Sequence, residues 1–307
     1  MNRAIAVVGS LNMDFVVSVD HLPAPGETVL GRDFQMIPGG KGANQACAAG
    51  KLGATVRMAG RVGYDVFADH LKASLAAAGV DVSAVNGCRS QPTGVAMIWV
   101  DGRGQNSIVV ASGANHELRA ADVESLRRTF SGAAFALFQL ETPLETVAAA
   151  LKLAREAGAQ TILDPAPAQP LSGEILQHVD ILTPNESEAS LLLGRSAARL
   201  GPAEAPEAAA ALRSLGPRTV IVKLGDRGCY CSSPGLERHF PAFPVEARDS
   251  TAAGDTFNAA LAVALAEGMA LGDGVRFANA AAAISVTRLG AQSSAPARAE
   301  VDALLKV

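Results

Sequence analysis

The chain has 307 residues, of which 49% are hydrophobic and 18% are charged, and its formal net charge is −4 at pH 7. This composition indicates a compact globular protein with a large core and excludes a disordered chain. The acidic balance argues against a nucleic-acid partner, and no apolar stretch reaches the roughly 18 residues of a membrane span.

The N-terminal stretch "MNRAIAVVGS" has one arginine before a short apolar run, with no cleavage context behind it. It predicts a first β-strand and not a targeting segment, so we expect a cytoplasmic protein without a membrane partner. No C-x-x-C pair occurs among the cysteines, which favours reduced thiols at Cys47, Cys88, Cys229 and Cys231. The histidines have no metal-ligand spacing, so we expect no zinc site.

Short apolar runs then alternate with longer amphipathic stretches. The runs predicted to be strands buried on both faces are 4–9, 134–140, 161–164, 180–184 and 219–225. One helix is predicted from Thr142 as N-cap to Gly158, with Pro143 in its first turn and Glu145 completing a capping box, and another ends at Gly79. The alternation predicts an α/β fold with a mainly parallel sheet between two layers of helices.

Two segments, residues 12–38 and 93–112, lack helical periodicity and contain β-rich runs separated by turn residues. In the second, "GVAMIWV", "DGRGQ" and "NSIVVAS" predict a hairpin. We expect both segments to form a small sheet outside the main one, serving as a lid or a dimer surface. No linker interrupts the chain, so residues 1–307 are predicted to be a single domain.

Polar side chains follow the predicted strands. They are Asn12, Asp14, Glu141, Asp164, Asn185 and Asp226. Each could be a turn former or a helix cap, but the carboxyl ends of parallel strands meet at one edge of a sheet, where ligands bind. Their common edge therefore predicts a binding site.

A glycine-rich turn, "PGGKGANQACAAGKLG" at residues 38–53, leads into a helix. It is not a Walker loop, because Lys41 is followed by Gly42 and not by serine or threonine. It also lacks the third glycine of a dinucleotide-binding fingerprint, which argues against a nicotinamide dehydrogenase. The turn would bring backbone N–H groups and the Asn44 amide to the sheet edge.

Two acidic residues allow both a structural and a functional interpretation. In "NESE", Asn185 and Glu188 fit a capping box, but Glu188 could also order water around a magnesium ion on nucleotide phosphates. In "STAAGDTFNAA", Asp255 could cap the following helix, or it could act as a base beside a phosphate bound at the helix N-terminus. Local sequence alone leaves both pairs of alternatives open.

Taken together, the motifs resemble the ribokinase-like (pfkB-type) carbohydrate kinases. In chain order they are "GSLNMD", "PAPGETV", "GGKGANQA", "LDPAPA", "LTPNESEA", "KLGDRG", "STAAGDTFNAA" and "AAAISVTRLGAQSS". The resemblance extends from Val7 to the end of the chain. It implies a three-layer α/β/α sandwich with a small β-sheet lid, and ATP-dependent phosphorylation of the primary hydroxyl of D-ribose to ribose 5-phosphate. It also implies Mg²⁺, activation by K⁺, and a homodimer formed through the lid.

The resemblance also implies residue roles. Asp255 would be the catalytic base, with an anion hole at Ala252, Ala253, Gly254 and Asp255. The sugar pocket would be Asn12, Asp14, Gly40, Lys41, Gly42, Asn44, Glu141 and Asp255. The nucleotide would be bound by Asn185, Lys223, Gly225, Asp226, Gly228, Gly254 and Asn279, and Glu188 would be associated with magnesium. The K⁺ site would be Asp249, Thr251, Ser285, Arg288, Gly290 and Ser294.

Some positions depart from the family pattern. Lys223 stands where many relatives carry a small hydroxyl residue, and Ser285 and Ser293 stand where alanine and proline are common. Two other functions remain open: a kinase for another sugar or a nucleoside, and a regulatory protein that binds a sugar without turnover. Aromatic residues are only 4% of the chain, which disfavours a nucleoside pocket. The intact "AAGD" turn disfavours the regulatory protein.

Overall fold

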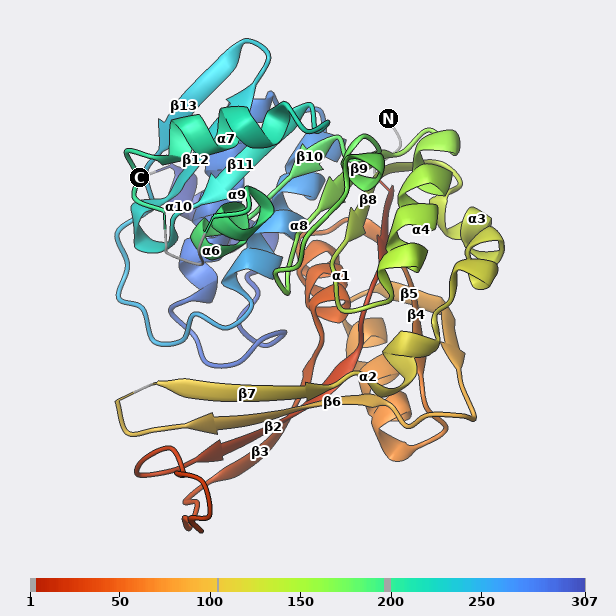
Figure 1. The fold of residues 1–307 in the computed structure, drawn as a ribbon, viewed down its shortest axis with the longest axis vertical. Coiled ribbons are helices and arrows are strands. Elements are labelled where there is room, and N and C mark those ends of the chain that lie inside the picture. The colour runs from red at the N-terminus through yellow and green to blue at the C-terminus, as the bar shows by residue number, and fades with distance from the viewer. Residues whose placement is uncertain (1–3, 104, 196–199, 307) are drawn as a thin grey trace.

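The computed structural model describes residues 4–103, 105–195 and 200–306. Within them a nine-stranded sheet forms the centre of the molecule (Figure 1). Its strands in spatial order are β13 (Leu236–Phe240), β12 (Cys229–Ser233), β11 (Thr219–Lys223), β10 (Ile181–Leu182), β9 (Gln160–Leu163), β8 (Ala133–Phe138), β1 (Ala4–Val8), β4 (Thr55–Val62) and β5 (Val80–Gly87). Neighbours from β11 to β5 are parallel, and β12 is antiparallel to both its neighbours.

The two faces of this sheet carry separate hydrophobic cores. On β1, Ile5 and Val7 belong to one core and Ala6 and Val8 to the other, because successive side chains of a strand point to opposite faces. The first core is covered by α1 (Lys41–Lys51), α2 (Val66–Ala77), α8 (Ala253–Ala266), α9 (Leu271–Ser285) and α10 (Arg298–Leu305). The second is covered by α3 (Arg127–Phe130), α4 (Leu144–Glu156), α5 (Gly173–Leu176), α6 (Glu186–Leu192) and α7 (Ala205–Arg213). The predicted three-layer α/β/α fold is confirmed.

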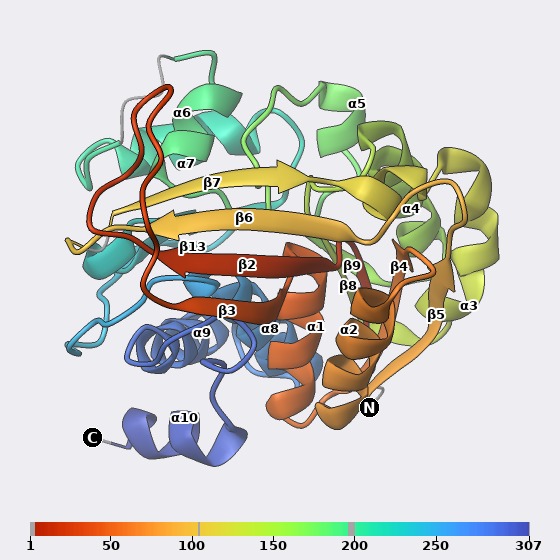
Figure 2. The ribbon, with the colours of Figure 1, turned by 90° about the horizontal axis from the view of Figure 1, so that it is seen from below.

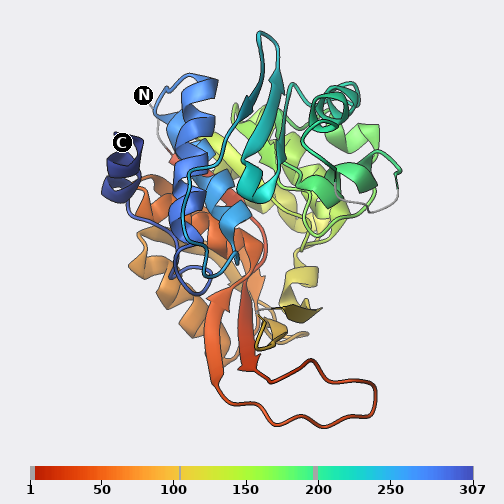
Figure 3. The same cartoon turned by 90° about the vertical axis from the view of Figure 1, so that its left-hand side faces the viewer.

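The predicted small sheet is also present, in the strand order β3 (Phe34–Gly39), β2 (Asn12–Ser18), β6 (Gly94–Val100) and β7 (Asn106–Ala111). β6 and β7 form the expected antiparallel hairpin, while Gly104 in its turn lies outside the described residues. β2 pairs in parallel with β6, so two segments distant in sequence make one sheet. Figures 2 and 3 show this sheet projecting from the main body, to which it is joined by contacts with α1 and α2.

One predicted helix start was wrong. α4 begins at Leu144 with Pro143 as its N-cap, and no side chain caps it. Pro143 adopts an extended ψ of 133°, which places Thr142 one residue outside the first turn. The buried Thr142 hydroxyl therefore has no hydrogen-bond partner within the described part of the chain.

Other local predictions agree with the structure. Gly79 and Gly158 follow helices with φ of 79° and 87°, a conformation that glycine adopts without strain. The cysteines are free, and Cys229 and Cys231 are both buried. Among the described residues, no helix combines the length and apolar character needed to cross a membrane. The described residues also contain the 3-10 helices η1 (Gly113–Glu117), η2 (Ala120–Leu126) and η3 (Gly225–Arg227).

Candidate active site

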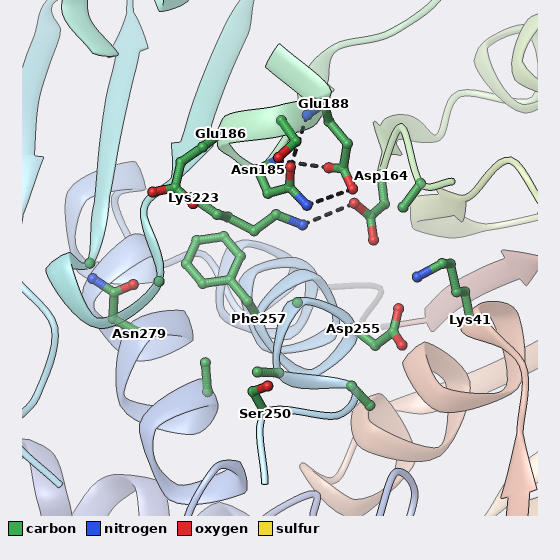
Figure 4. Close-up of a pocket in the computed structure, with 18 residues that line it drawn as sticks. Lys41, Asp164, Asn185, Glu186, Glu188, Lys223, Ser250, Asp255, Phe257 and Asn279 are labelled. Carbon is green, nitrogen blue, oxygen red and sulfur yellow. Dashed lines mark hydrogen bonds and ion pairs between the residues drawn. The ribbon is translucent and has the colours of Figure 1, made fainter. Parts of the chain in front are cut away.

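A cavity of about 470 Å³ lies at the carboxyl ends of the parallel strands, between α6 and the start of α8 (Figure 4). Lys41 and Asp255 lie at one end of it, and Asn279 lies at the other (Figure 4). Asp164 and Lys223 lie between them. The cavity therefore joins residues of the predicted sugar pocket to residues of the predicted nucleotide site.

The Asp255 carboxylate does not cap α8. It is buried and accepts hydrogen bonds from Asn44 Nδ2 and Gln45 Nε2, each at 3.0 Å. Burial raises the pKa of Asp255 to about 6, although Lys41 and the two amides act in the opposite direction. A carboxylate held in this way, at the mouth of a helix, is suited to accept a proton near neutral pH.

The turn before α8 is formed by Ala252, whose φ of 58° is in the left-handed region. This conformation leads directly into the first turn of the helix, where N–H groups point outward. Within the described part of the chain, the N–H groups of Gly254 and Asp255 have no protein acceptor. The N–H of Ala253 donates to Ser250 O at 3.3 Å. Two of the predicted anion-hole donors are therefore free, and a third is engaged in a long hydrogen bond.

The glycine-rich turn before α1 allows close backbone contact. Gly40 has φ of 89°, and a Cβ at Gly40 would lie 2.7 Å from Asn12 N. A Cβ at Gly42 would lie 2.7 Å from Gly9 Cα. Any larger residue would move α1 away from the strand ends, so these glycines place Lys41 and Asn44 beside Asp255.

Several carboxylates surround the end of the cavity at Lys41 and Asp255, which we call the sugar end, although Asp14 and Glu141 lie beside the cavity and do not line it. Burial raises the pKa of Asp14 to about 7, with further contributions from Glu141 and Asp255. Burial disfavours the charged form of Lys41, but Asp255, Asp164 and Glu141 raise its pKa overall. Because the sugar end brings several carboxylates around one lysine, it can accept hydrogen bonds from several hydroxyl groups.

Further hydrogen bonds hold the side chains of Glu141 and Asn12 in place. Glu141 Oε2 accepts hydrogen bonds from Lys41 N at 3.1 Å and from the Ser10 hydroxyl. Asn12 Oδ1 accepts a hydrogen bond of 2.7 Å from Asn115 Nδ2. The structure thus brings the predicted sugar residues together beside the cavity, where Lys41 and Asp255 line it and the others lie behind them. It adds Ser10 and Asn115, which the sequence did not indicate.

At the nucleotide end, the predicted capping box is confirmed. Asn185 Oδ1 accepts from Glu188 N at 2.9 Å, and the Glu188 carboxylate accepts from Asn185 N at 2.7 Å and from Asn185 Nδ2 at 2.8 Å. Gly225, Gly228 and Asn279 line the cavity as predicted. Asp226 is exposed on η3 and is not among the lining residues.

The segments that carry the predicted cation residues meet at Asp249, whose N–H donates to Val286 O at 3.1 Å. Asp249 accepts hydrogen bonds from Thr251 N at 2.9 Å and from Gly290 N at 2.8 Å, so its carboxylate joins these two segments. The Ser285 and Ser294 hydroxyls donate to Ala282 O and Ala291 O in their own segments. The Arg288 guanidinium pairs with Glu300 on α10.

Gln45, which the sequence did not indicate, links the carboxylates of Asp255 and Asp164. Its Nε2 donates to Asp255 Oδ1 at 3.0 Å and to Asp164 Oδ2 at 3.3 Å, and its Oε1 accepts from Gln139 Nε2 at 2.7 Å. Its position directly after Asn44 was the only available signal. Adjacent residues of a helix point about 100° apart, so the sequence gave no reason to expect that Asn44 and Gln45 would both donate to the Asp255 carboxylate.

Comparisons with known proteins match this geometry to one family. The family model for pfkB family carbohydrate kinases matches residues 2–298. Ribokinase of Bacillus subtilis is 44% identical over 303 residues, covering 99% of both chains, and ribokinase of Haemophilus influenzae is 43% identical over 300 residues, covering 98% of this chain and 97% of the other.

Solved structures agree with the sequence comparisons. A crystal structure of ribokinase from Thermotoga maritima superposes with a TM-score of 0.89 at 43% identity, over 99% of both chains. The structure of Arabidopsis thaliana ribokinase complexed with ribose and ATP gives a TM-score of 0.90 at 36% identity, over 100% of both chains.

Proposed function

The chain belongs to the pfkB family of carbohydrate kinases, and we propose that it transfers the γ-phosphoryl group of ATP to the primary hydroxyl of D-ribose, giving ribose 5-phosphate. The observation that carries this proposal is the buried Asp255 carboxylate, held by two amides between the acidic sugar end and the free N–H groups of α8. A group in this position can touch the reacting hydroxyl.

The reaction follows from these positions. The sugar hydroxyl oxygen attacks the γ-phosphorus while Asp255 takes the hydroxyl proton, and the bond from phosphorus to the bridging oxygen of ADP breaks. Negative charge on the transferred phosphoryl oxygens is met by the N–H groups of Gly254 and Asp255. Asp14, Asn44 and Glu141 orient the sugar so that this hydroxyl faces Asp255.

The residues present suit a magnesium ion carried by the nucleotide. Among the described residues, no group of three or more histidine, cysteine, aspartate or glutamate side chains could hold a metal alone. Mg²⁺ typically keeps several waters and binds phosphates together with one or two carboxylates. Glu188 is the carboxylate that would hold such waters, and the ion would neutralise phosphate charge.

A monovalent cation beside the anion hole is part of the proposal. Asp249 supplies a full negative charge, and its two hydrogen bonds bring the backbone near Thr251 and Gly290 together. A single carboxylate with backbone carbonyl oxygens suits a weakly bound K⁺. Binding there would stabilise the turn that presents Gly254 and Asp255, so we expect K⁺ to activate.

The small sheet is the proposed dimer surface. Its exposed apolar side chains lie on both faces: Phe34, Met36, Met97 and Val109 share one face by strand register, and Ile108 and Val110 lie on the other. An apolar patch of this kind on one sheet marks an interaction site. A second copy of the same sheet would cover it and close the sugar end of the cavity.

The test is ADP release with Mg-ATP and D-ribose, 2-deoxyribose, fructose, adenosine or uridine, in KCl and in NaCl. We expect turnover with ribose that is faster in KCl, and a loss of kcat by about 10²- to 10⁴-fold in Asp255→Asn, with ribose still bound in calorimetry. Preference for another substrate would overturn the assignment of ribose. Ribose binding without turnover in the unmodified protein would favour the regulatory alternative, and near-normal turnover in Asp255→Asn would remove Asp255 as the base.

A further inference from the structure

Lys223 places an ammonium group inside the cavity, at the end of β11. Its Nζ lies 2.9 Å from Asp164 Oδ1, and only 15% of its side chain is exposed. Figure 4 shows the side chain crossing the cavity from β11 toward Asp164, between the nucleotide end and Asp255. The family resemblance assigns this position to nucleotide binding but gives no role to an ammonium, because a small hydroxyl residue is common there.

The ammonium also lies next to the proposed anion hole. A Cβ added to Gly254 would lie 3.2 Å from Lys223 Nζ. Gly254 is one of the two residues whose N–H groups are free, so the ammonium lies beside the position where the N–H of Gly254 would bind a phosphoryl oxygen. The space left by the missing side chain of Gly254 is what allows this approach.

The surrounding charges keep Lys223 protonated. Burial disfavours its charged form, but Asp164, Glu188 and Asp255 raise its pKa overall. The ammonium is thus a fixed positive charge among three carboxylates. Its ion pair with Asp164 leaves two of its N–H donors for other acceptors.

Two roles are compatible with an ion pair of this kind. In the first, Lys223 and Asp164 only join β11 to β9 across β10, and the pair is structural. In the second, the ammonium contacts the reacting phosphate. Position favours the second, because a purely structural pair would not need to lie within 3.2 Å of the Gly254 Cβ position at the site of transfer.

We propose that Lys223 is a catalytic residue whose ammonium binds the γ-phosphoryl oxygens of ATP during transfer. The inference rests on the proposed kinase reaction. Lys223 donates hydrogen bonds and keeps its protons, the hydroxyl proton goes to Asp255, and the electron pair of the broken phosphorus–oxygen bond leaves with ADP. Asp164 holds the ammonium while the γ-phosphate is absent, and Gln45 links Asp164 to Asp255 on the opposite side.

The test compares Lys223→Met and Lys223→Arg with Lys152→Met, which removes an exposed lysine from α4. Calorimetry gives Kd for Mg-ADP and for an ATP analogue with an imido group in place of the β–γ bridging oxygen. In Lys223→Met we expect the analogue to bind about 10- to 100-fold more weakly, because a charged hydrogen bond is lost, and ADP to change by less than about threefold. We expect kcat to fall about 10²- to 10³-fold, Lys223→Arg to recover part of it, and Lys152→Met to match the unmodified protein.

Equal weakening of ADP and the analogue, or unchanged binding of both, would overturn the proposal and leave the structural ion pair. If Lys223→Met does not fold, Lys223→Gln replaces it in the same comparison with the same expected result, because glutamine keeps a polar end group but removes the charge. The nucleotide measurements need no sugar. Failure of the unmodified protein to phosphorylate ribose would therefore refute the proposed substrate, while the difference between ADP and the analogue would still test Lys223.

Discussion

Replacing Asp14 with asparagine should stabilise the protein at pH 8 while it weakens sugar binding. The pKa of Asp14 rises from 3.8 to about 7, mainly through burial, so between these two pH values the folded protein holds a proton there that the unfolded chain has lost, and at pH 8 the folded protein bears the cost of the buried charge. Stability contributed by this group is therefore greatest below pH 3.8 and is lost as pH rises to about 7. The difference between the two pKa values is worth about 4 kcal/mol, at about 1.4 kcal/mol per pKa unit.

Asparagine has nearly the same shape and does not ionise. We therefore expect Asp14→Asn to have a higher free energy of unfolding than the unmodified protein at pH 8, and this gain to be about 3 kcal/mol larger at pH 8 than at pH 5. Urea denaturation followed by circular dichroism at both pH values measures this difference, with the exposed Asp33→Asn as a matched control. A gain in Asp14→Asn that is the same at both pH values, or a loss at pH 8, would show that Asp14 is not held against ionisation.

The same variant tests the sugar pocket. If Asp14 binds the sugar as proposed, removing its carboxylate should raise Kd for ribose by about 10- to 100-fold. Calorimetry at pH 8 measures this, and an unchanged Kd would remove Asp14 from the pocket. Stability and affinity are expected to change in opposite directions, because the cost of burying the charge is offset only when the sugar is bound.

Gln45→Met removes two hydrogen-bond donors, one from Asp255 and one from Asp164, so the pKa of Asp255 should rise. The acid limb of the plot of kcat against pH should then shift to higher pH, while KM for ATP changes by less than about threefold. An acid limb at the same pH in Gln45→Met would show that Gln45 does not tune the base. Val109→Lys places a charge on the exposed face of the small sheet and should convert a dimer to a monomer in light scattering, whereas Val66→Lys on α2 should not. A monomer in the unmodified protein would refute the proposed dimer surface itself.

Local and periodic information in the sequence was enough for much of the fold. The alternation of apolar runs and amphipathic stretches predicted the three layers, because burial on both faces of a parallel sheet requires it. The capping box of Asn185 and Glu188 and the hairpin of β6 and β7 depend on residues close in sequence, and both are present. The motifs also led to the family and to most of the residues around Asp255.

Contacts between distant residues were decided only by the tertiary structure. Gln45 meets Asp255 from 210 residues away, and Lys223 meets Asp164 from 59 residues away. Nothing local in the sequence indicated that Gln45 would reach Asp255 or that Lys223 would pair with Asp164, because these pairings are set by how α1, β9, β11 and α8 converge at the sheet edge. Thr142 failed as a cap for a related reason: the backbone at Pro143 sets where α4 starts. The sequence thus determined which elements form, and their packing determined which polar groups meet.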